Sequence, residues 1–346
     1  MRLYEYAPVP ALVAAVSDVR SARVPAVDVH NHLGRWLTGG TRWMAPDVGR
    51  LTASMDELGV EAVVNLDGRW GRELQANLER YDQARPGRFA TFCQLDWSLL
   101  SEPGGPDRLL TLLRRSAEAG ACGVKVWKDL GMSVRDATGT LVPVDDPRLS
   151  DVWDAAGELG LPVLVHVADP IAFWQPVDRH NERWEELVLH PDWHHGSRAV
   201  PSHGELVGSL GRLVAAHRGT TFIAAHLASC AEDLGRVDGL LAEHPNLLVD
   251  LSARAAELGR QPRAARALVT GHADRVLWGT DSFPFDAGEY RTWFRLLETA
   301  DEHFPYATAP VPPQGRWAVS GLDLPDDVLA RVYAGNARRV IPALRR

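Results

Sequence analysis

Eight short apolar segments, each followed by a stretch with helical periodicity, constrain the fold of this chain more than any other sequence feature. The apolar segments are rich in β-branched residues and are bounded by Gly, Pro or Asp, which is typical of buried parallel strands. Eight strand–helix units in one chain predict an α/β fold, a (β/α)8 TIM barrel. The predicted strands are residues 26–30, 60–66, 89–95, 123–127, 161–167, 221–227, 246–251 and 275–279.

The 346 residues fit a single barrel domain, 1–346, with three additions. We expect the barrel core to comprise 25–282 and 322–340, and the N-terminal extension to pack across the barrel. Residues 168–202, after strand five, are rich in Trp, His, Pro and Arg. Because long loops in compact domains are usually functional, this insertion is expected to form a lid, with surface decoration as the alternative. A second insertion spans 283–321.

The composition restricts the classes of molecule that this protein can bind. The formal net charge of −8 argues against nucleic acid, which requires a basic surface. No apolar run reaches the roughly 20 residues of a membrane span, and the N-terminal sequence shows no secretory signal. Cys93, Cys122 and Cys230 have no paired spacing, so we expect a reducing, cytoplasmic location and neither a disulfide framework nor a thiolate zinc site. The expected partner is a small-molecule substrate, and a homodimer is compatible with such a barrel.

Polar residues that bind metals stand at the ends of several predicted strands. The candidates are His30 and His32 at the end of strand one, His166 at the end of strand five, His226 at the end of strand six and Asp281 at the end of strand eight. In a parallel barrel all strand carboxyl ends open on one face, so these side chains should converge. Each histidine alone is better explained as a hydrogen-bonded core residue. Together, imidazoles and a carboxylate suit a divalent cation such as zinc.

These motifs carry a resemblance to a known family. Val-Asp-Val-His-Asn-His at 27–32, His166, His226, Gly-Thr-Asp at 279–281 and Tyr-Ala-Gly-Asn-Ala-Arg-Arg at 333–339 resemble the amidohydrolase superfamily. The most similar branch is the amidohydrolase-2, or aminocarboxymuconate semialdehyde decarboxylase-like, group. The resemblance implies that His30, His32, His166 and Asp281 bind one divalent ion, with zinc expected and manganese or iron as alternatives. It also implies that His226 assists the chemistry, while Asp281 could serve as both ligand and base.

Lys125 lies in an apolar stretch, Gly-Val-Lys-Val-Trp at 123–127, that predicts a buried strand. A buried lysine is unfavourable unless it is paired or neutralised, so we list it as a catalytic candidate. Some members of the wider superfamily carboxylate a strand-four lysine, which then bridges two metal ions. A second metal at Lys125 is therefore an alternative. We favour one metal with an unmodified lysine.

Aromatic and basic residues near strand ends predict the substrate pocket. Tryptophan side chains there would form flat apolar walls, and arginines could hold a carboxylate with two hydrogen bonds. Packing and structural ion pairs are the alternative roles for each of them. The candidate substrate-binding residues are Arg35, Arg69, Trp127, Trp174, Arg183 and Arg254. They predict a small acidic or aromatic substrate.

Two reactions fit this set of residues. The first is hydrolysis of a lactone, ester or amide bond by a metal-activated water, because a bound divalent ion lowers the pKa of water to about 7. The second is nonoxidative decarboxylation of a small aromatic or muconate-like acid, which uses the same ligand types. A non-catalytic metal-binding barrel is the third alternative.

Overall fold

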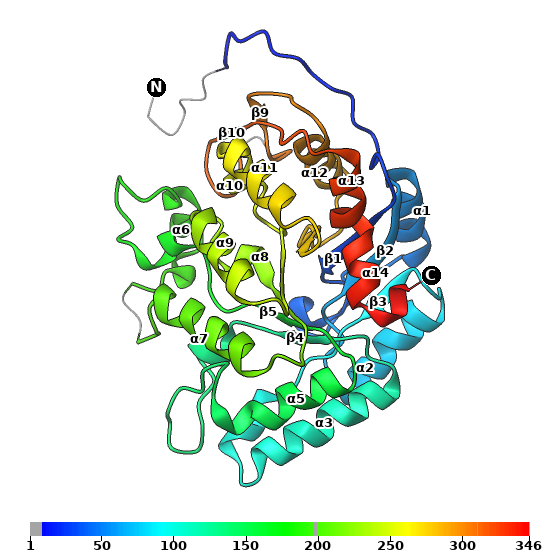
Figure 1. Cartoon of the computed structure of the whole chain (residues 1–346), viewed down its shortest axis with the longest axis vertical. Helices are drawn as coiled ribbons and strands as arrows, with labels where there is room; N and C mark the ends of the chain where they lie inside the picture. The colour runs from blue at the N-terminus through cyan, green and yellow to red at the C-terminus, as the bar shows by residue number, and fades with distance from the viewer. Residues whose placement is uncertain (1–8, 197–198, 310, 346) are drawn as a thin grey trace.

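A computed structural model describes residues 9–196, 199–309 and 311–345 and shows a closed parallel β-barrel surrounded by helices (Figure 1). The predicted TIM barrel is therefore confirmed. Seven of the strands are shorter than the predicted apolar segments, whereas β1 extends one residue beyond its segment. The barrel strands are β1 (Ala26–Asn31), β2 (Val60–Asn65), β3 (Phe89–Thr91), β4 (Val124–Val126), β5 (Val163–Val165), β6 (Phe222–Ala224), β7 (Leu247–Asp250) and β8 (Val276–Leu277).

The barrel is assembled from two parallel sheets, β1-β2-β3 and β4-β5-β6-β7-β8. Two isolated parallel bridges join them, Cys93 with Val124 and Asn31 with Ser282. On the second seam, the amide of Asp281 donates to the carbonyl of His30 at 2.8 Å. This bond holds the end of β8 against the end of β1, so two stretches of chain that carry predicted ligands become neighbours.

Helices cover the outside of the barrel, and the C-terminal segment closes one of its ends (Figure 1). Val27, Val29, Leu164 and Ile223 lie in one buried cluster with residues 334–344, so this segment packs against the barrel interior. The helices are α1 (Val48–Leu58), α2 (Gly71–Leu78), α3 (Gly105–Ala119), α4 (Asp129–Met132), α5 (Ser150–Glu158), α6 (Trp184–Leu189), α7 (His203–Ala216), α8 (Ala225–Ala228), α9 (Leu234–Glu243), α10 (Ala255–Arg260), α11 (Pro262–Gly271), α12 (Ala287–Glu298), α13 (Asp326–Ala330) and α14 (Asn336–Val340).

The additions to the barrel have structure of their own. The insertion after β5 contains α6, and the insertion after β8 contains α12 and the antiparallel pair β9 (Phe304–Pro305) and β10 (Ala318–Val319). The expectation that the whole N-terminal extension packs across the barrel is wrong for residues 9–16, which are exposed and run outside the molecule (Figure 1). The first anchoring contact described is at Ser17, whose amide and hydroxyl both donate to Asp301 at 2.8 Å.

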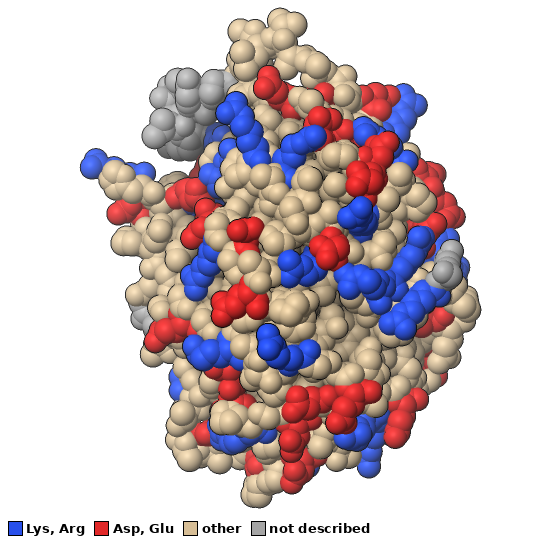
Figure 2. Space-filling model, in the orientation of Figure 1, with Lys and Arg blue, Asp and Glu red and all other residues tan. Residues whose placement is uncertain are grey.

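Acidic and basic side chains are intermingled on the face shown in Figure 2. Among the helices of the described residues, none is long and apolar enough to cross a membrane.

Candidate metal centre

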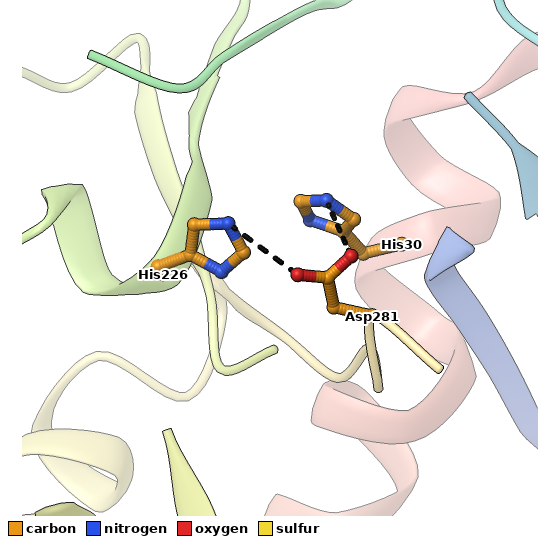
Figure 3. A group of neighbouring side chains, drawn as sticks. All are labelled: His30, His226 and Asp281. Carbon is orange, nitrogen blue, oxygen red and sulfur yellow. Dashed lines mark ion pairs between the residues drawn. The ribbon is translucent and has the colours of Figure 1, made fainter. Parts of the chain in front are cut away.

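The strand ends bring the predicted ligands to one place. Ligand atoms of His30, His226 and Asp281 lie within 4.8 Å of one another (Figure 3). His32 Nε2 lies 3.2 Å from Asp281 Oδ1, and the ring centroids of His166 and His226 are 4.5 Å apart. Three imidazoles, from the ends of β1 and β6, therefore lie beside the Asp281 carboxylate from the end of β8, and His166 lies next to His226.

Two buried carboxylates orient the histidines of β1. Nδ1 of His30 donates to Asp250 at 2.9 Å, and Nδ1 of His32 donates to Asp67 at 2.8 Å. A carboxylate that holds Nδ1–H leaves the lone pair on Nε2, which is how proteins orient metal-binding imidazoles. The sequence alone did not predict that Asp67 and Asp250 orient these histidines. Its only signal for Asp67 was a polar residue directly after the apolar end of strand two.

The other two histidines are held by backbone carbonyl groups. His226 Nδ1 lies 2.9 Å from the carbonyl oxygen of Ser252, and the Ser252 hydroxyl is at the same distance. Because a carbonyl only accepts, His226 Nδ1 carries the proton and Nε2 carries the lone pair. His166 has the opposite arrangement, since its Nε2 donates to the carbonyl of Ala168 at 3.0 Å. Its free lone pair is consequently on Nδ1.

Strained backbone aims two of these side chains. His226 and Asp281 have positive φ angles of 56° and 62°, a region that non-glycine residues rarely adopt. The amide of His226 donates to Asp250 Oδ1 at 2.9 Å, which helps to hold this conformation. Strain of this kind persists where surrounding contacts enforce it, and it gathers at functional sites. Gly279 allows the two strands to meet, because a Cβ there would lie 2.8 Å from His30 Cβ.

The electrostatics of the cluster follow from burial and close carboxylates. Burial lowers the pKa of His226 to about 3, and nearby Arg254 adds to this effect, so the ring is neutral at pH 7. Burial also opposes charge on His32, but Asp67 and Asp281 together raise its pKa to about 9. Although burial raises the pKa of Asp281, the adjacent histidines lower it well below its usual value. Asp281 is thus an ionised carboxylate.

This arrangement fits a divalent cation. Nε2 of His30, His32 and His226 lie 3.7, 3.2 and 3.8 Å from oxygens of Asp281. With Nδ1 protonated in each ring, these nitrogens and oxygens are all electron-pair donors that face one another. Such a set repels itself unless a proton or a metal ion lies among its members, and nitrogen with oxygen donors suits a borderline ion such as zinc. In the absence of metal, a proton on His32 supplies part of that positive charge.

Lys125 lies inside the barrel directly beside this cluster. It is fully buried, and Nζ lies 3.3 Å from His30 Nε2. Burial lowers its pKa to about 8. Nζ also lies 5.0 Å from the centroid of the Trp127 ring, and that ring lies 5.1 Å from the His32 ring. Trp127 Nε1 is buried without a hydrogen-bond partner among the described residues, so it can donate to a bound molecule.

The guanidinium groups of two predicted substrate-binding arginines, Arg69 and Arg254, each make one hydrogen bond among the described residues. Arg69 donates to Gln94 at 3.0 Å and stacks on Trp36 and Trp70. Arg254 is 7% exposed, donates to the adjacent carbonyl of Ala253 and is close enough to His226 to lower its pKa.

The remaining predicted contacts are engaged within the protein. The guanidinium of Arg35 forms two hydrogen bonds to Glu73, and Trp174 donates to the carbonyl of Pro201 at 3.0 Å. The guanidinium of Arg183, another predicted substrate contact, also has partners within the protein. Arg183 is 1% exposed and its guanidinium is held between Glu186 and Glu257, so it anchors the insertion after β5 to α10.

Residues 27–343 match the family described as Amidohydrolase. The chain belongs to the amidohydrolase family. This membership confirms the resemblance seen in the strand-end motifs, and it supports a metal-dependent catalytic role.

Solved structures with the same fold carry both decarboxylase and amidohydrolase names. A 2,6-dihydroxybenzoate decarboxylase from Rhizobium is 19% identical, with a TM-score of 0.57 and coverage of 92% of this chain and 99% of that one. A dihydroxybenzoic acid decarboxylase from Polaromonas sp. JS666, with bound manganese and 2-nitroresorcinol, is 15% identical, with a TM-score of 0.57 and coverage of 93% and 98%.

An amidohydrolase from Burkholderia multivorans with bound zinc is 16% identical, with a TM-score of 0.53 and coverage of 92% of this chain and 99% of that one. At these identities the likeness concerns the fold. No curated protein matches the chain.

Proposed function

We propose that this amidohydrolase is a metal-dependent hydrolase that cleaves a lactone, ester or amide bond of a small acidic or aromatic substrate. The observation that carries the proposal is the pair of proton acceptors at the cluster. His226 presents an unprotonated Nε2 because the Ser252 carbonyl holds the proton on Nδ1. Its Nε2 lies 3.8 Å from the ionised carboxylate of Asp281. Hydrolysis needs such an acceptor, since the attacking water must lose a proton.

The roles of the side chains follow from these positions. Asp281 takes the proton of the attacking water and returns it to the departing oxygen or nitrogen. His226 Nε2 accepts a hydrogen bond from the same water and orients it. One divalent ion, proposed to be zinc with manganese or iron as alternatives, would be held by His30, His32, His166 and Asp281 and would supply Lewis acidity.

Decarboxylation is the second candidate, and the cations beside the cluster favour it. Lys125 touches His30, and Arg254 lies near His226, where its guanidinium makes a single hydrogen bond, to a backbone carbonyl, among the described residues. Two cations at this position can hold a substrate carboxylate, the group that a decarboxylase removes. The same cations would bind the carboxylate of an acidic lactone or amide, so the products must separate the two reactions.

The deciding experiment combines metal analysis with a screen. The purified chain is assayed for bound metals and then offered lactones, amides and hydroxybenzoic acids, with detection of both ring opening and CO2. We expect one metal ion per chain, hydrolysis without CO2, and loss of turnover on chelation that zinc or manganese restores. CO2 release from an aromatic acid would replace the proposal by decarboxylation. Full turnover by metal-free protein would refute both reactions.

The metal analysis also tests whether Lys125 is modified. We propose that Lys125 is unmodified, which predicts a metal-to-protein ratio near one, whereas a ratio near two would favour a carboxylated lysine that bridges two ions. We also propose a homodimer in a reducing, cytoplasmic setting, and light scattering coupled to size-exclusion chromatography would determine the mass in solution.

A further inference from the structure

A cavity outside the ligand cluster shares Asp281 with it. It has a volume of about 260 Å³ and lies between the end of β8, helix α12 and the β9–β10 segment. Trp293, Ala255, Ala307 and Pro313 give it apolar walls. A space of this size accepts a substituent or a small ring, because one water molecule in the liquid takes up roughly 30 Å³.

Most polar side chains of this wall are engaged within the protein. Thr280 donates to Asp28, Thr292 to the carbonyl of Gly288, Tyr306 to the carbonyl of Gly315 and Gln314 to the carbonyl of Ala253. Asp286 is also engaged, because its carboxylate accepts the amides of Gly288 and Glu289 at the start of α12.

Glu289 differs from these groups, because the Ser282 hydroxyl is the one side-chain hydrogen-bond partner of its carboxyl group among the described residues. Its half-buried carboxyl group lines the cavity, and no lysine or arginine lines this space in the part of the chain that the structure describes. The groups that face it are the hydroxyl of Ser282 and the carboxylates of Asp281, Asp28 and Asp286. Glu289 therefore has spare acceptor capacity and no counter-charge. The cations of the site, Lys125 and Arg254, lie beside His30 and His226 instead.

We propose that this cavity is a specificity subsite for the substrate, and that Glu289 accepts a hydrogen bond from an amine or a hydroxyl group carried there. The inference rests on the proposed function, because it places the reacting bond at the adjacent cluster. The carboxyl groups of Asp281, Asp286 and Glu289 line this space without a lysine or arginine, which favours a hydrogen-bond donor over an anionic substituent. The substrate therefore has two ends, with any carboxylate near Lys125 and Arg254 and its hydrogen-bond donor at Glu289.

The test uses the zinc-loaded full chain and three probes of one shape, benzylamine, benzyl alcohol and benzoate, titrated by calorimetry. The variant is Glu289→Gln, and the matched control is Glu243→Gln, which makes the same substitution at a side chain that is 75% exposed. We expect Glu289→Gln to weaken benzylamine by about tenfold, benzyl alcohol by less, and to leave benzoate unchanged or tighter. Equal benzylamine affinities in the two variants would overturn the proposal.

A second variant guards against misfolding of Glu289→Gln. Ala307→Phe fills the cavity while Glu289 stays in place, and it should abolish binding of both benzylamine and benzyl alcohol. Retained benzylamine binding in a folded Ala307→Phe protein would also refute the subsite. The outcome is separate from that of the proposed function. If the chain binds zinc and hydrolyses a substrate but Glu289→Gln leaves benzylamine affinity unchanged, only the subsite is refuted. If Glu289→Gln weakens benzylamine binding but the chain shows no turnover, only the proposed reaction is refuted.

Discussion

The Asp250→Asn substitution tests whether buried carboxylates decide which imidazole nitrogen faces the metal. Asp250 Oδ2 accepts His30 Nδ1–H at 2.9 Å, and Oδ1 accepts the amides of His226 and Ser252. Asparagine keeps the Oδ1 bonds but places an amide N–H where Oδ2 accepted. Two donors then face each other, so the His30 proton moves to Nε2 and removes the lone pair that points to Asp281.

The expected cost is a 10–100-fold loss of metal affinity, about 1.4–2.7 kcal/mol, the usual effect of removing a partner that orients a ligand. Asp238→Asn is the matched control, because Asp238 also bonds a histidine, His272, at 2.8 Å but is 65% exposed. Affinity is measured by competition with a chelator, and folding is checked by urea denaturation. If both variants bind zinc as tightly as the unchanged chain, orientation by Asp250 has no role in metal binding.

Three further substitutions probe the fold and the charge network. Gly279→Ala should destabilise the chain by about 1–3 kcal/mol, because its Cβ would lie 2.8 Å from a neighbouring Cβ, whereas Gly271→Ala, with open space around it, should not; urea denaturation compares them. Arg183→Met leaves Glu257 buried without its partner and should cost about 3–5 kcal/mol in urea, with partial recovery when Glu257→Leu is added; equal stability of single and double variants would contradict this. Burial raises the pKa of Asp169, but contacts with a histidine and a lysine outweigh it and lower the pKa to about 2; this contribution to stability is present above about pH 4 and is lost as the pH falls toward 2, so stability measured from pH 6 to pH 3 should fall less steeply in Asp169→Asn.

The barrel architecture and the convergence of the histidines could be predicted because both depend on short segments of the sequence. Apolar β-branched segments bounded by turn residues mark buried strands, and His166 and His226 stand one and two residues after the ends of two such strands. Barrel topology then requires their carboxyl ends to share one face. The hydrogen-bond partners could not be read in this way, since Asp250 lies 220 residues from His30 and no local pattern pairs them. Arg183 shows the same limit, because only the folded chain places Glu257 against it.

The left-handed turn at the end of β6 explains why the position of His226 at a strand end does not by itself predict the role of its side chain. Residues 226–229 all have φ angles between 56° and 58°, although none is glycine. Such a turn has no sequence signature and is unfavourable for L-residues, so tertiary contacts must enforce it. Asp250 supplies one contact through the His226 amide, and the same carboxylate holds His30. A single buried aspartate thereby couples the backbone that aims the proton acceptor to the ring that would hold the metal, so a change at Asp250 should impair turnover and metal binding together.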